Sequence, residues 1–296
     1  MFENYVNGMP GWVKDEDAVK AVLETLPYPI FGDAAAHLAG TGEDKTVLLY
    51  KSHITLFGKH LPANEQQIGS CVSHCYSRAV DYLSLIEILN GDREEFKSIS
   101  HSAIYGMARE LGGMLGGGDG LVGAYASKCV NTLGVTSNEF AQDSRTDDRL
   151  ARTWGSRGAP REIKEDAKKH LIKTVSLVAT PEEARDAICN GYPIGVCSGQ
   201  GFTMQRDSEG RCRPQGSWAH AMMWSGYDAD KRRFCVEQSW GQNTPSGPTY
   251  LDQPDNSFWI DWDVAARMLR ERDSFSLGSL DGWPAQKLPR ELFVLI

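Results

Sequence analysis

The chain changes its pattern of apolar residues near residue 160, and this change restricts the folds that it can adopt. Upstream, apolar residues recur at a helical period in three stretches that glycine closes, at 71–89, 100–114 and 121–133. Downstream, strand-like runs alternate with turn residues, at 174–179, 193–197, 220–227, 233–238 and 257–260. Helices followed by antiparallel strands predict an α+β fold with a helical N-terminal lobe and a barrel-like β lobe.

The other segments predict the domain organisation. Residues 1–60 read as an N-terminal extension with one short helix at 15–25 and a β-like run at 46–54. Residues 61–296 read as one two-lobed domain, with the helical lobe at about 61–160 and the β lobe at about 161–296. The β lobe opens with a helix at 161–171, and a second short helix begins at Pro181.

Charge and composition exclude several classes of partner. The net charge is −8, and no run of five like charges occurs, which argues against nucleic acid and against a polybasic membrane-binding segment. No window approaches the length of a transmembrane helix, and no basic and apolar signal segment opens the chain. The seven scattered cysteines are odd in number, so we expect reduced thiols and a cytoplasmic protein, with a virion-borne protein as the exception.

The Gly-Ser-Cys sequence at residues 69–71 places a cysteine where a loop enters a predicted helix. Free N–H groups and the positive end of the helix dipole stabilise a thiolate there, and the same N–H groups can donate to an oxyanion. Taken alone, Cys71 is more simply explained as a small buried apolar side chain, as free cysteines commonly are. Its functional interpretation therefore depends on its partners.

Two later motifs supply a base and an amide. His220 opens an apolar strand, and Gln238 precedes a Ser-Trp-Gly turn at residues 239–241. A cysteine, then a histidine, then an amide is the order of a thiol nucleophile, its base and the group that orients the base. Each has an ordinary alternative as well, because His220 can be a core histidine, Gln238 a surface residue and Trp240 a core residue.

With these residues together, the chain resembles the papain-like cysteine proteases. Their nucleophile segment carries Gln and then Gly-Ser-Cys at a helix start, their histidine segment reads His-Ala before an apolar run ending in Gly-Tyr, and their third segment reads Asn-Ser-Trp-Gly. This chain has Gly-Ser-Cys at 69–71, the histidine segment at 220–227 and Gln-Ser-Trp-Gly at 238–241. The resemblance covers roughly residues 60–262 and implies a cleft between the lobes that holds Cys71, His220 and Gln238.

The resemblance also implies an oxyanion-hole glutamine, six residues before the cysteine. Glu65 occupies that position here, and Gln66 and Gln67 follow it; because a carboxylate would oppose a developing oxyanion, we assign the role to Gln66. Gln238 stands where the family has asparagine. Secreted members carry a disulfide from a cysteine three residues before the nucleophile, but Ile68 occupies that position, so this bridge is absent.

Further contacts follow from the same resemblance. The glycine-rich turn at 116–120 is expected to border the cleft, so Gly118, Trp218 and Trp240 are predicted to contact substrate, with Trp240 covering the bond from His220 to Gln238. The loops at 199–202 and 215–218 are candidate cleft walls or ordinary hairpin loops. The prosegment of the family has no room before Cys71, although part of residues 1–55 can cover the cleft.

The predicted function is a cysteine-type peptidase that hydrolyses peptide or isopeptide bonds of a peptide or protein substrate, without a cofactor or metal. Cys71, His74 and Cys75 have ligand-type side chains, but zinc needs a fourth ligand and no second Cys/His pair lies nearby. The 116–120 turn lacks the Lys-Ser/Thr of a phosphate loop. Two alternatives stay open: a weakly active or inactive papain-like binding or structural protein, for example of a phage particle, and an enzyme that transfers the acyl group to an amine.

Overall fold

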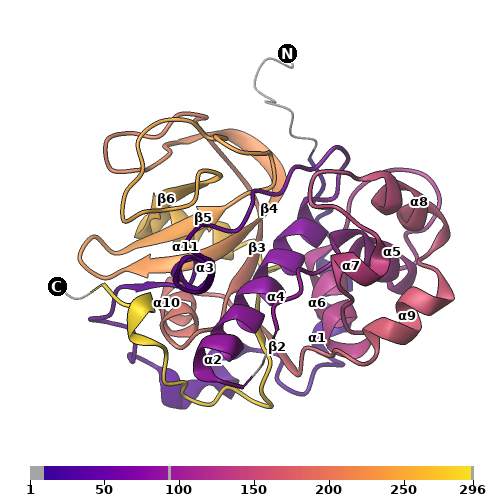
Figure 1. Ribbon diagram of the computed structural model, residues 1–296, viewed down its shortest axis with the longest axis horizontal. Helices are drawn as coiled ribbons and strands as arrows, with labels where there is room; N and C mark the ends of the chain where they lie inside the picture. The colour runs from indigo at the N-terminus through magenta and orange to yellow at the C-terminus, as the bar shows by residue number, and fades with distance from the viewer. Residues whose placement is uncertain (1–9, 93–94, 295–296) are drawn as a thin grey trace.

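A computed structural model of the protein describes residues 10–92 and 95–294. Figure 1 shows a sheet-containing lobe and a helical lobe side by side, with one long helix, α4 (Cys71–Asn90), between them. Every residue of α4 from 71 to 86 is buried, since the helix packs on the other helices and on strands β3 and β4. Gly91 ends it in the left-handed conformation, as the Asn-Gly signal predicts.

The helical lobe surrounds one side of α4. Two of its helices begin at a serine that caps them, as at Ser100, which accepts a hydrogen bond from the Ala103 N–H. The helices of this lobe are α5 (His101–Leu111), α6 (Gly123–Thr132), α7 (Asn138–Ala141) and α8 (Arg149–Arg157). Helix α9 (Arg161–Ala167), which the sequence pattern placed at the start of the β lobe, lies beside them (Figure 1).

The β lobe is built on one antiparallel sheet, which is open among the described residues. Its strand order is β2-β7-β3-β4-β5-β6, and β1 pairs with β4 beside this path. The strands are β1 (Val47–Leu48), β2 (Thr174–Leu177), β3 (Ile194–Phe202), β4 (Pro214–Asp228), β5 (Arg233–Glu237), β6 (Ser257–Asp261) and β7 (Phe275–Gly278). Helices α10 (Pro181–Cys189) and α11 (Trp262–Leu269) pack on this lobe.

Strand β4 explains why the two lobes stay together. Ala221 and Met223 point into the core shared with α4, whereas Met222 and Trp224 point into the second core on the other face of the sheet. Both faces of the strand are therefore buried, and its apolar run is continuous rather than alternating. Burial of each large side chain stabilises the fold by roughly 1.5–3 kcal/mol.

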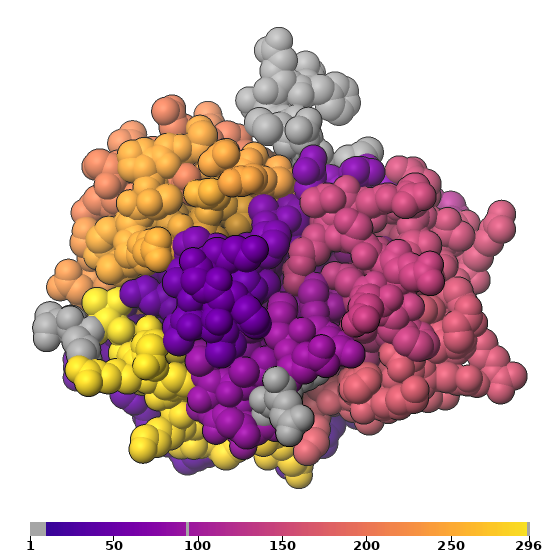
Figure 2. All heavy atoms as spheres, viewed as in Figure 1, coloured from indigo at the N-terminus to yellow at the C-terminus, as the bar shows by residue number. Residues whose placement is uncertain are grey.

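Residues 10–60 pack on both lobes. Helix α1 (Glu16–Leu23) contacts α6, whereas α2 (Phe31–Ala34), the 3₁₀ turn η1 (Ala36–Leu38) and β1 lie with the β lobe. Figure 2 shows part of this indigo chain on the front face, between the orange β lobe and the pink helical lobe. Residues 1–9 of the predicted extension lie outside the described residues.

One secondary-structure prediction is corrected. The β-like run at 46–54 forms only the short strand β1, and helix α3 (Lys51–Phe57) begins three residues after that strand ends. Leu49 donates its N–H to Ser225, and the chain then turns away from the sheet. Among the helices of the described residues, none combines the length and the hydropathy that crossing a bilayer requires.

Candidate active site

Cys71 is the first residue of α4 and is fully buried. The backbone N–H of Ala221, the residue after His220, donates to its sulfur over 3.4 Å. Gly69 precedes it in a turn where any side chain would collide, because an added Cβ would lie 2.9 Å from the Cβ of Asp119. The Gly-Ser-Cys turn thus holds the sulfur directly against strand β4.

His220 lies on β4, opposite Ser198 of β3. Its ring stacks on Trp240 with the ring centroids 4.4 Å apart, and Trp240 packs edge-on against Trp218 at 4.7 Å. Both ring nitrogens are buried, and neither has a hydrogen-bond partner within the described part of the chain. The structure therefore brings the cysteine and histidine segments together without a hydrogen bond between thiol and ring.

Burial sets the protonation of both groups. It raises the pKa of the Cys71 thiol to about 12, although the N–H groups of Ala221, Val72 and Gly11 oppose the shift. Burial also lowers the pKa of His220 to about 3, and the charge of His74 lowers it further. At neutral pH this site therefore holds a thiol and a neutral imidazole rather than an ion pair.

A segment of the N-terminal chain, residues 10–13, packs closely on the turn that precedes the buried Cys71, and we call it the strap. The N–H groups of Gly11 and Trp12 donate to the Ala219 carbonyl over 2.9 and 3.0 Å. On the other side, Leu121 donates to Gly11 over 2.8 Å, and Val13 donates back to Leu121 over 3.0 Å. The strap thus joins the residue before His220 to the end of the glycine-rich turn.

The indole of Trp12 anchors the strap. Its Nε1 donates to Asp273 over 2.7 Å, and the same carboxylate accepts the N–H groups of Gly123 and Ala124 at the start of α6. Trp12 is only 6% exposed. This anchor links the strap to both lobes, and nothing in the sequence motifs indicated Asp273.

Of the three residues considered for the oxyanion hole, only Gln66 is buried, whereas Glu65 and Gln67 are exposed. The Gln66 side chain donates to the Ile68 carbonyl over 2.9 Å and accepts the Ser239 hydroxyl over 2.6 Å. Gln66 thus ties the nucleophile turn to the Ser-Trp-Gly motif. Its role toward an oxyanion remains a prediction.

Gln238 lies one residue after β5, and its amide does not reach the imidazole. Its Nε2 donates to the Thr244 carbonyl over 2.6 Å, and its Oε1 is buried without a partner among the described residues. The side chain lines a cavity of about 10 Å³ that His74 and Ala221 also line. That volume suits a single water molecule. An orienting role toward His220 stays a prediction.

The predicted substrate contacts divide into two groups. Gly118 lies in the exposed glycine-rich turn, and the Arg109 guanidinium donates to its carbonyl over 2.9 Å, a support that the motifs did not indicate. Trp218 and Trp240 are 5% and 4% exposed, so they pack around His220 and offer little surface. The two segments predicted as cleft-wall or hairpin loops, 199–202 and 215–218, lie instead in strands β3 and β4. Residues 199, 200, 216 and 217 of these segments line one hollow of about 250 Å³ together with Met268 and Glu271.

His74 does not join Cys71 and Cys75 in a metal site. It lies instead with His101 and Asp148, the one group of metal-type ligands found among the described residues. The two imidazoles are stacked, 3.7 Å between centroids and 18° between planes. An ion lies in the plane of each imidazole that binds it, so two nearly parallel rings at this spacing cannot both bind one ion. Instead, both rings face the Asp148 carboxylate, with one nitrogen of each ring 3.4 and 3.6 Å from its Oδ1.

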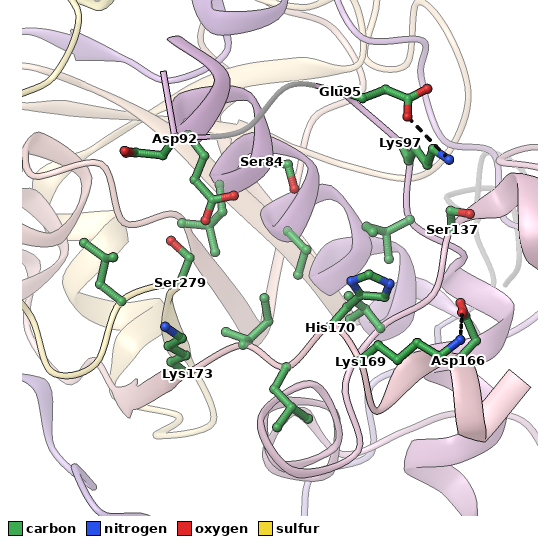
Figure 3. Close-up of a pocket in the computed structure, with 18 of the residues that line it drawn as sticks. Ser84, Asp92, Glu95, Lys97, Ser137, Asp166, Lys169, His170, Lys173 and Ser279 are labelled. Atoms are coloured by element: carbon green, nitrogen blue, oxygen red, sulfur yellow. Dashed lines mark hydrogen bonds and ion pairs between the residues drawn. The ribbon is translucent and has the colours of Figure 1, made fainter. Parts of the chain in front are cut away.

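A separate hollow of about 1100 Å³ opens beside the C-terminal half of α4 (Figure 3). Lys97 pairs there with Glu95, and Lys169 pairs with Asp166. No cysteine is among its described lining residues. The candidate active site is therefore the strap-covered region around Cys71.

Comparisons with known proteins agree with this architecture. No protein-family model matches the chain, and no curated protein matches it by sequence. Among solved structures, the cysteine protease xylellain from Xylella fastidiosa is 17% identical, with a TM-score of 0.59 and 91% of each chain covered. Procathepsin B S9 from Trypanosoma congolense is 11% identical, with a TM-score of 0.59, over 94% of this chain and 88% of that one.

A third similar structure is the digestive procathepsin L2 proteinase of Tenebrio molitor larval midgut. It is 15% identical, with a TM-score of 0.57, and the match covers 95% of this chain and 81% of that one. These matches extend over both lobes, so the likeness concerns the whole architecture. The chain has the α+β fold of the papain-like cysteine proteases.

Proposed function

We propose that the chain is a latent cysteine peptidase in which Cys71 is the nucleophile and His220 the base. The observation that carries the proposal is the hydrogen bond from the Ala221 N–H to the Cys71 sulfur. It places the helix start that favours a thiolate directly against the strand that presents the histidine. The fold supports the same class of reaction by analogy.

The reaction follows from the chemistry of these groups. His220 takes the Cys71 proton, and the sulfur attacks the carbonyl carbon of a peptide or isopeptide bond. The Cys71 N–H and the Gln66 amide donate to the oxyanion. The C–N bond breaks as His220 returns the proton to the amine, which leaves a thioester. Water, deprotonated by His220, then attacks the thioester, and the carboxylic acid and the free thiol are released.

The strap makes the closed chain latent. Cys71 has no exposed surface, and the backbone of Gly11 lies against it, so a substrate carbonyl cannot reach the sulfur. Displacing the strap would expose the thiol to water, remove the main cause of its raised pKa and allow an ion pair with His220. Activity is therefore expected only in chains whose strap is open.

The test compares the native chain with Trp12→Ala, which lacks the strap anchor. Each is incubated with iodoacetamide and with a mixed peptide library, and labelled sites and cleaved bonds are identified by mass spectrometry. We expect Cys71 of Trp12→Ala to be labelled selectively. Peptide cleavage should vanish when Cys71→Ala or His220→Ala is combined with Trp12→Ala in the same chain. Cys235→Ala is the matched control, because Cys235 is a buried cysteine on β5. If Cys71 reacts no faster than the other six cysteines, the proposal fails.

The second candidate function is a binding or structural protein with a papain-like fold. It is favoured by the missing hydrogen bond between His220 and Gln238 in the described residues and by the full burial of the sulfur. In that case Trp12→Ala would expose Cys71 to slow alkylation that His220→Ala leaves unchanged. A transferase would instead give a product in which an added amine replaces water.

A further inference from the structure

We propose that Asp148 is a positioning residue that fixes the nucleophile turn, a role that rests on the proposed function. One oxygen of its carboxylate, Oδ2, accepts three hydrogen bonds from that turn: from the N–H of Gln67 at 2.5 Å, the N–H of Ile68 at 3.0 Å and the hydroxyl of Ser70 at 2.9 Å. These three donors lie between Gln66 and Cys71. Asp148 therefore sets the spacing between the two groups expected to hold the oxyanion.

The position of Asp148 in its own helix points the same way. It is the N-cap residue of α8, where an aspartate ordinarily accepts an N–H of the first helical turn and contributes about 1 kcal/mol. Its side chain makes no capping bond. The carboxylate is instead directed at the nucleophile turn, about 80 residues earlier in the chain.

The other carboxylate oxygen, Oδ1, is enclosed by two histidines. His74 Nε2 lies 3.4 Å from it and His101 Nδ1 lies 3.6 Å from it, and the two rings stack on each other. Burial alone would raise the pKa of Asp148, but the neighbouring His74 and His101 rings and the Gln67 N–H, which donates to it, hold that pKa below its ordinary value. The carboxylate therefore stays ionised and keeps its acceptor strength.

This arrangement takes the place of a covalent link. Ile68 stands where secreted papain-like enzymes carry a disulfide-forming cysteine, and its N–H is one of the three donors to Asp148. Asp148 belongs to the helical lobe, so the carboxylate ties the turn to that lobe without sulfur chemistry. The turn is thereby held under reducing conditions, in which a disulfide would open.

The consequence for catalysis is geometric. The Cys71 sulfur and the Gln66 amide act on the same carbonyl group, and a displacement of about 1 Å lowers the rate by about 100-fold. Without the carboxylate, two backbone N–H groups and one hydroxyl lose a buried acceptor, and the turn is free to rearrange. Substrate binding along the cleft walls does not depend on these donors.

The experiment introduces Asp148→Ala and Asp148→Asn into the strap-opened Trp12→Ala chain and measures kcat, KM, alkylation of Cys71 and hydrogen exchange at the Gln67 and Ile68 amides. We expect Asp148→Ala to lower kcat about 100-fold with KM changed less than about twofold. Asn keeps one acceptor oxygen, so kcat of Asp148→Asn should be at least about tenfold higher than kcat of Asp148→Ala. Exchange at both amides should accelerate in Asp148→Ala.

The matched control is Asp186→Asn. Asp186 is also buried and also holds a loop, since it accepts the N–H groups of Gly40 at 2.8 Å and Gly42 at 3.0 Å, but it lies outside the candidate site. The Asp186→Asn substitution should change the stability of the chain without changing kcat or hydrogen exchange at the Gln67 and Ile68 amides. An Asp148→Ala chain with kcat within about threefold of its parent would overturn the proposal.

The two proposals fail in different ways. If the parent chain cleaves nothing, exchange at Gln67 and Ile68 still tests Asp148, and unchanged protection in both variants overturns its role. If Asp148→Ala does not fold, hydrogen exchange in Asp148→Asn tests the role of Asp148 by itself, and unchanged protection at Gln67 and Ile68 overturns it.

Discussion

The Ala219 carbonyl, one residue before His220, accepts the backbone N–H of Gly11 over 2.9 Å. A residue near the start of the chain thus occupies the hydrogen-bonding edge beside the candidate base. Gly11 also packs on the turn before Cys71, since an added Cβ there would lie 2.4 Å from the Gly69 carbonyl oxygen, and Cys71 is completely buried. Access to the candidate site therefore depends on the four-residue strap.

Removing the strap anchor should open the site. Trp12→Ala deletes a buried indole and its hydrogen bond to Asp273, so the strap loses its main attachment. We expect alkylation of Cys71 near pH 8 to accelerate at least about tenfold, because exposure lowers the thiol pKa from its raised value. Lys14→Ala is the control: Lys14 adjoins the strap, but its pair with Glu271 is partly exposed and contributes little. Equal rates for the two variants would contradict this account.

A methyl group at position 11 should displace the strap by contact alone. A Cβ added to Gly11 would lie 2.4 Å from the Gly69 carbonyl oxygen, a backbone atom that cannot rotate away as a flexible side chain could. We predict that Gly11→Ala raises Cys71 alkylation while the melting temperature changes little. Gly117→Ala adds a methyl group where no atom lies within 4 Å, so alkylation should not change. If Gly11→Ala leaves Cys71 protected, the strap is not in steric contact with the nucleophile turn.

Replacing the candidate base should stabilise the closed protein. Both nitrogens of His220 are buried without partners among the described residues, and each such group costs roughly 1–3 kcal/mol. His220→Phe keeps the ring against Trp240, so we expect the free energy of unfolding to rise by about 1 kcal/mol and peptide cleavage by the strap-opened chain to disappear. Urea unfolding provides the measurement.

His53→Phe is the contrasting variant. His53 is buried too, but its Nδ1 bonds to the Lys59 carbonyl at 2.6 Å, so its replacement should lower stability by about 1 kcal/mol. A loss of stability in His220→Phe similar to that in His53→Phe would mean that His220 has a structural partner in solution.

Periodicity and turn signals predicted the elements that carry the motifs. Helix α4 follows its apolar period from Cys71 to the Asn-Gly end, and β4 and β5 coincide with the runs around His220 and before Gln238. Helix α11 was missed although Val264, Ala265, Met268 and Leu269 form a buried stripe, so its signal was available. The start of helix α3 was predicted to be strand because β-forming residues precede it. The point at which the chain turns away from the sheet depends on the hydrogen bond from Leu49 to Ser225, a tertiary contact that the local sequence does not show.

The site was only partly accessible from the sequence for a physical reason. Motif order indicates which segments meet, but the direction of a side chain depends on contacts distant in the chain, as when the Gln238 amide bonds to Thr244. Asp148 and Asp273 belong to no motif, and their partners lie about 80 and 260 residues away. The strap is held in place largely by backbone hydrogen bonds. Residues of almost any type can make such bonds, so the sequence does not reveal them.

The Asp273 carboxyl gives the protein a pH-dependent stability. Burial raises its pKa from 3.8 to about 7, although the bonds from Trp12, Gly123 and Ala124 oppose the shift. Because the folded pKa lies above the unfolded one, the stability that the protonated carboxyl contributes is fully present below about pH 4 and is lost as the pH rises to about 7. Over that window the native chain should lose on the order of 4 kcal/mol relative to Asp273→Asn, which cannot ionise.

Urea unfolding of both proteins from pH 4 to pH 8 measures this difference, and parallel pH profiles would show that the carboxyl titrates at its ordinary value.

The Asp273 carboxyl also makes the attachment of the strap depend on pH. An ionised carboxylate accepts the Trp12 indole N–H more strongly than a neutral amide does. At pH 8 Cys71 should therefore be alkylated faster in Asp273→Asn than in the native chain, and this difference should shrink below pH 7, where the native carboxyl is neutral as well.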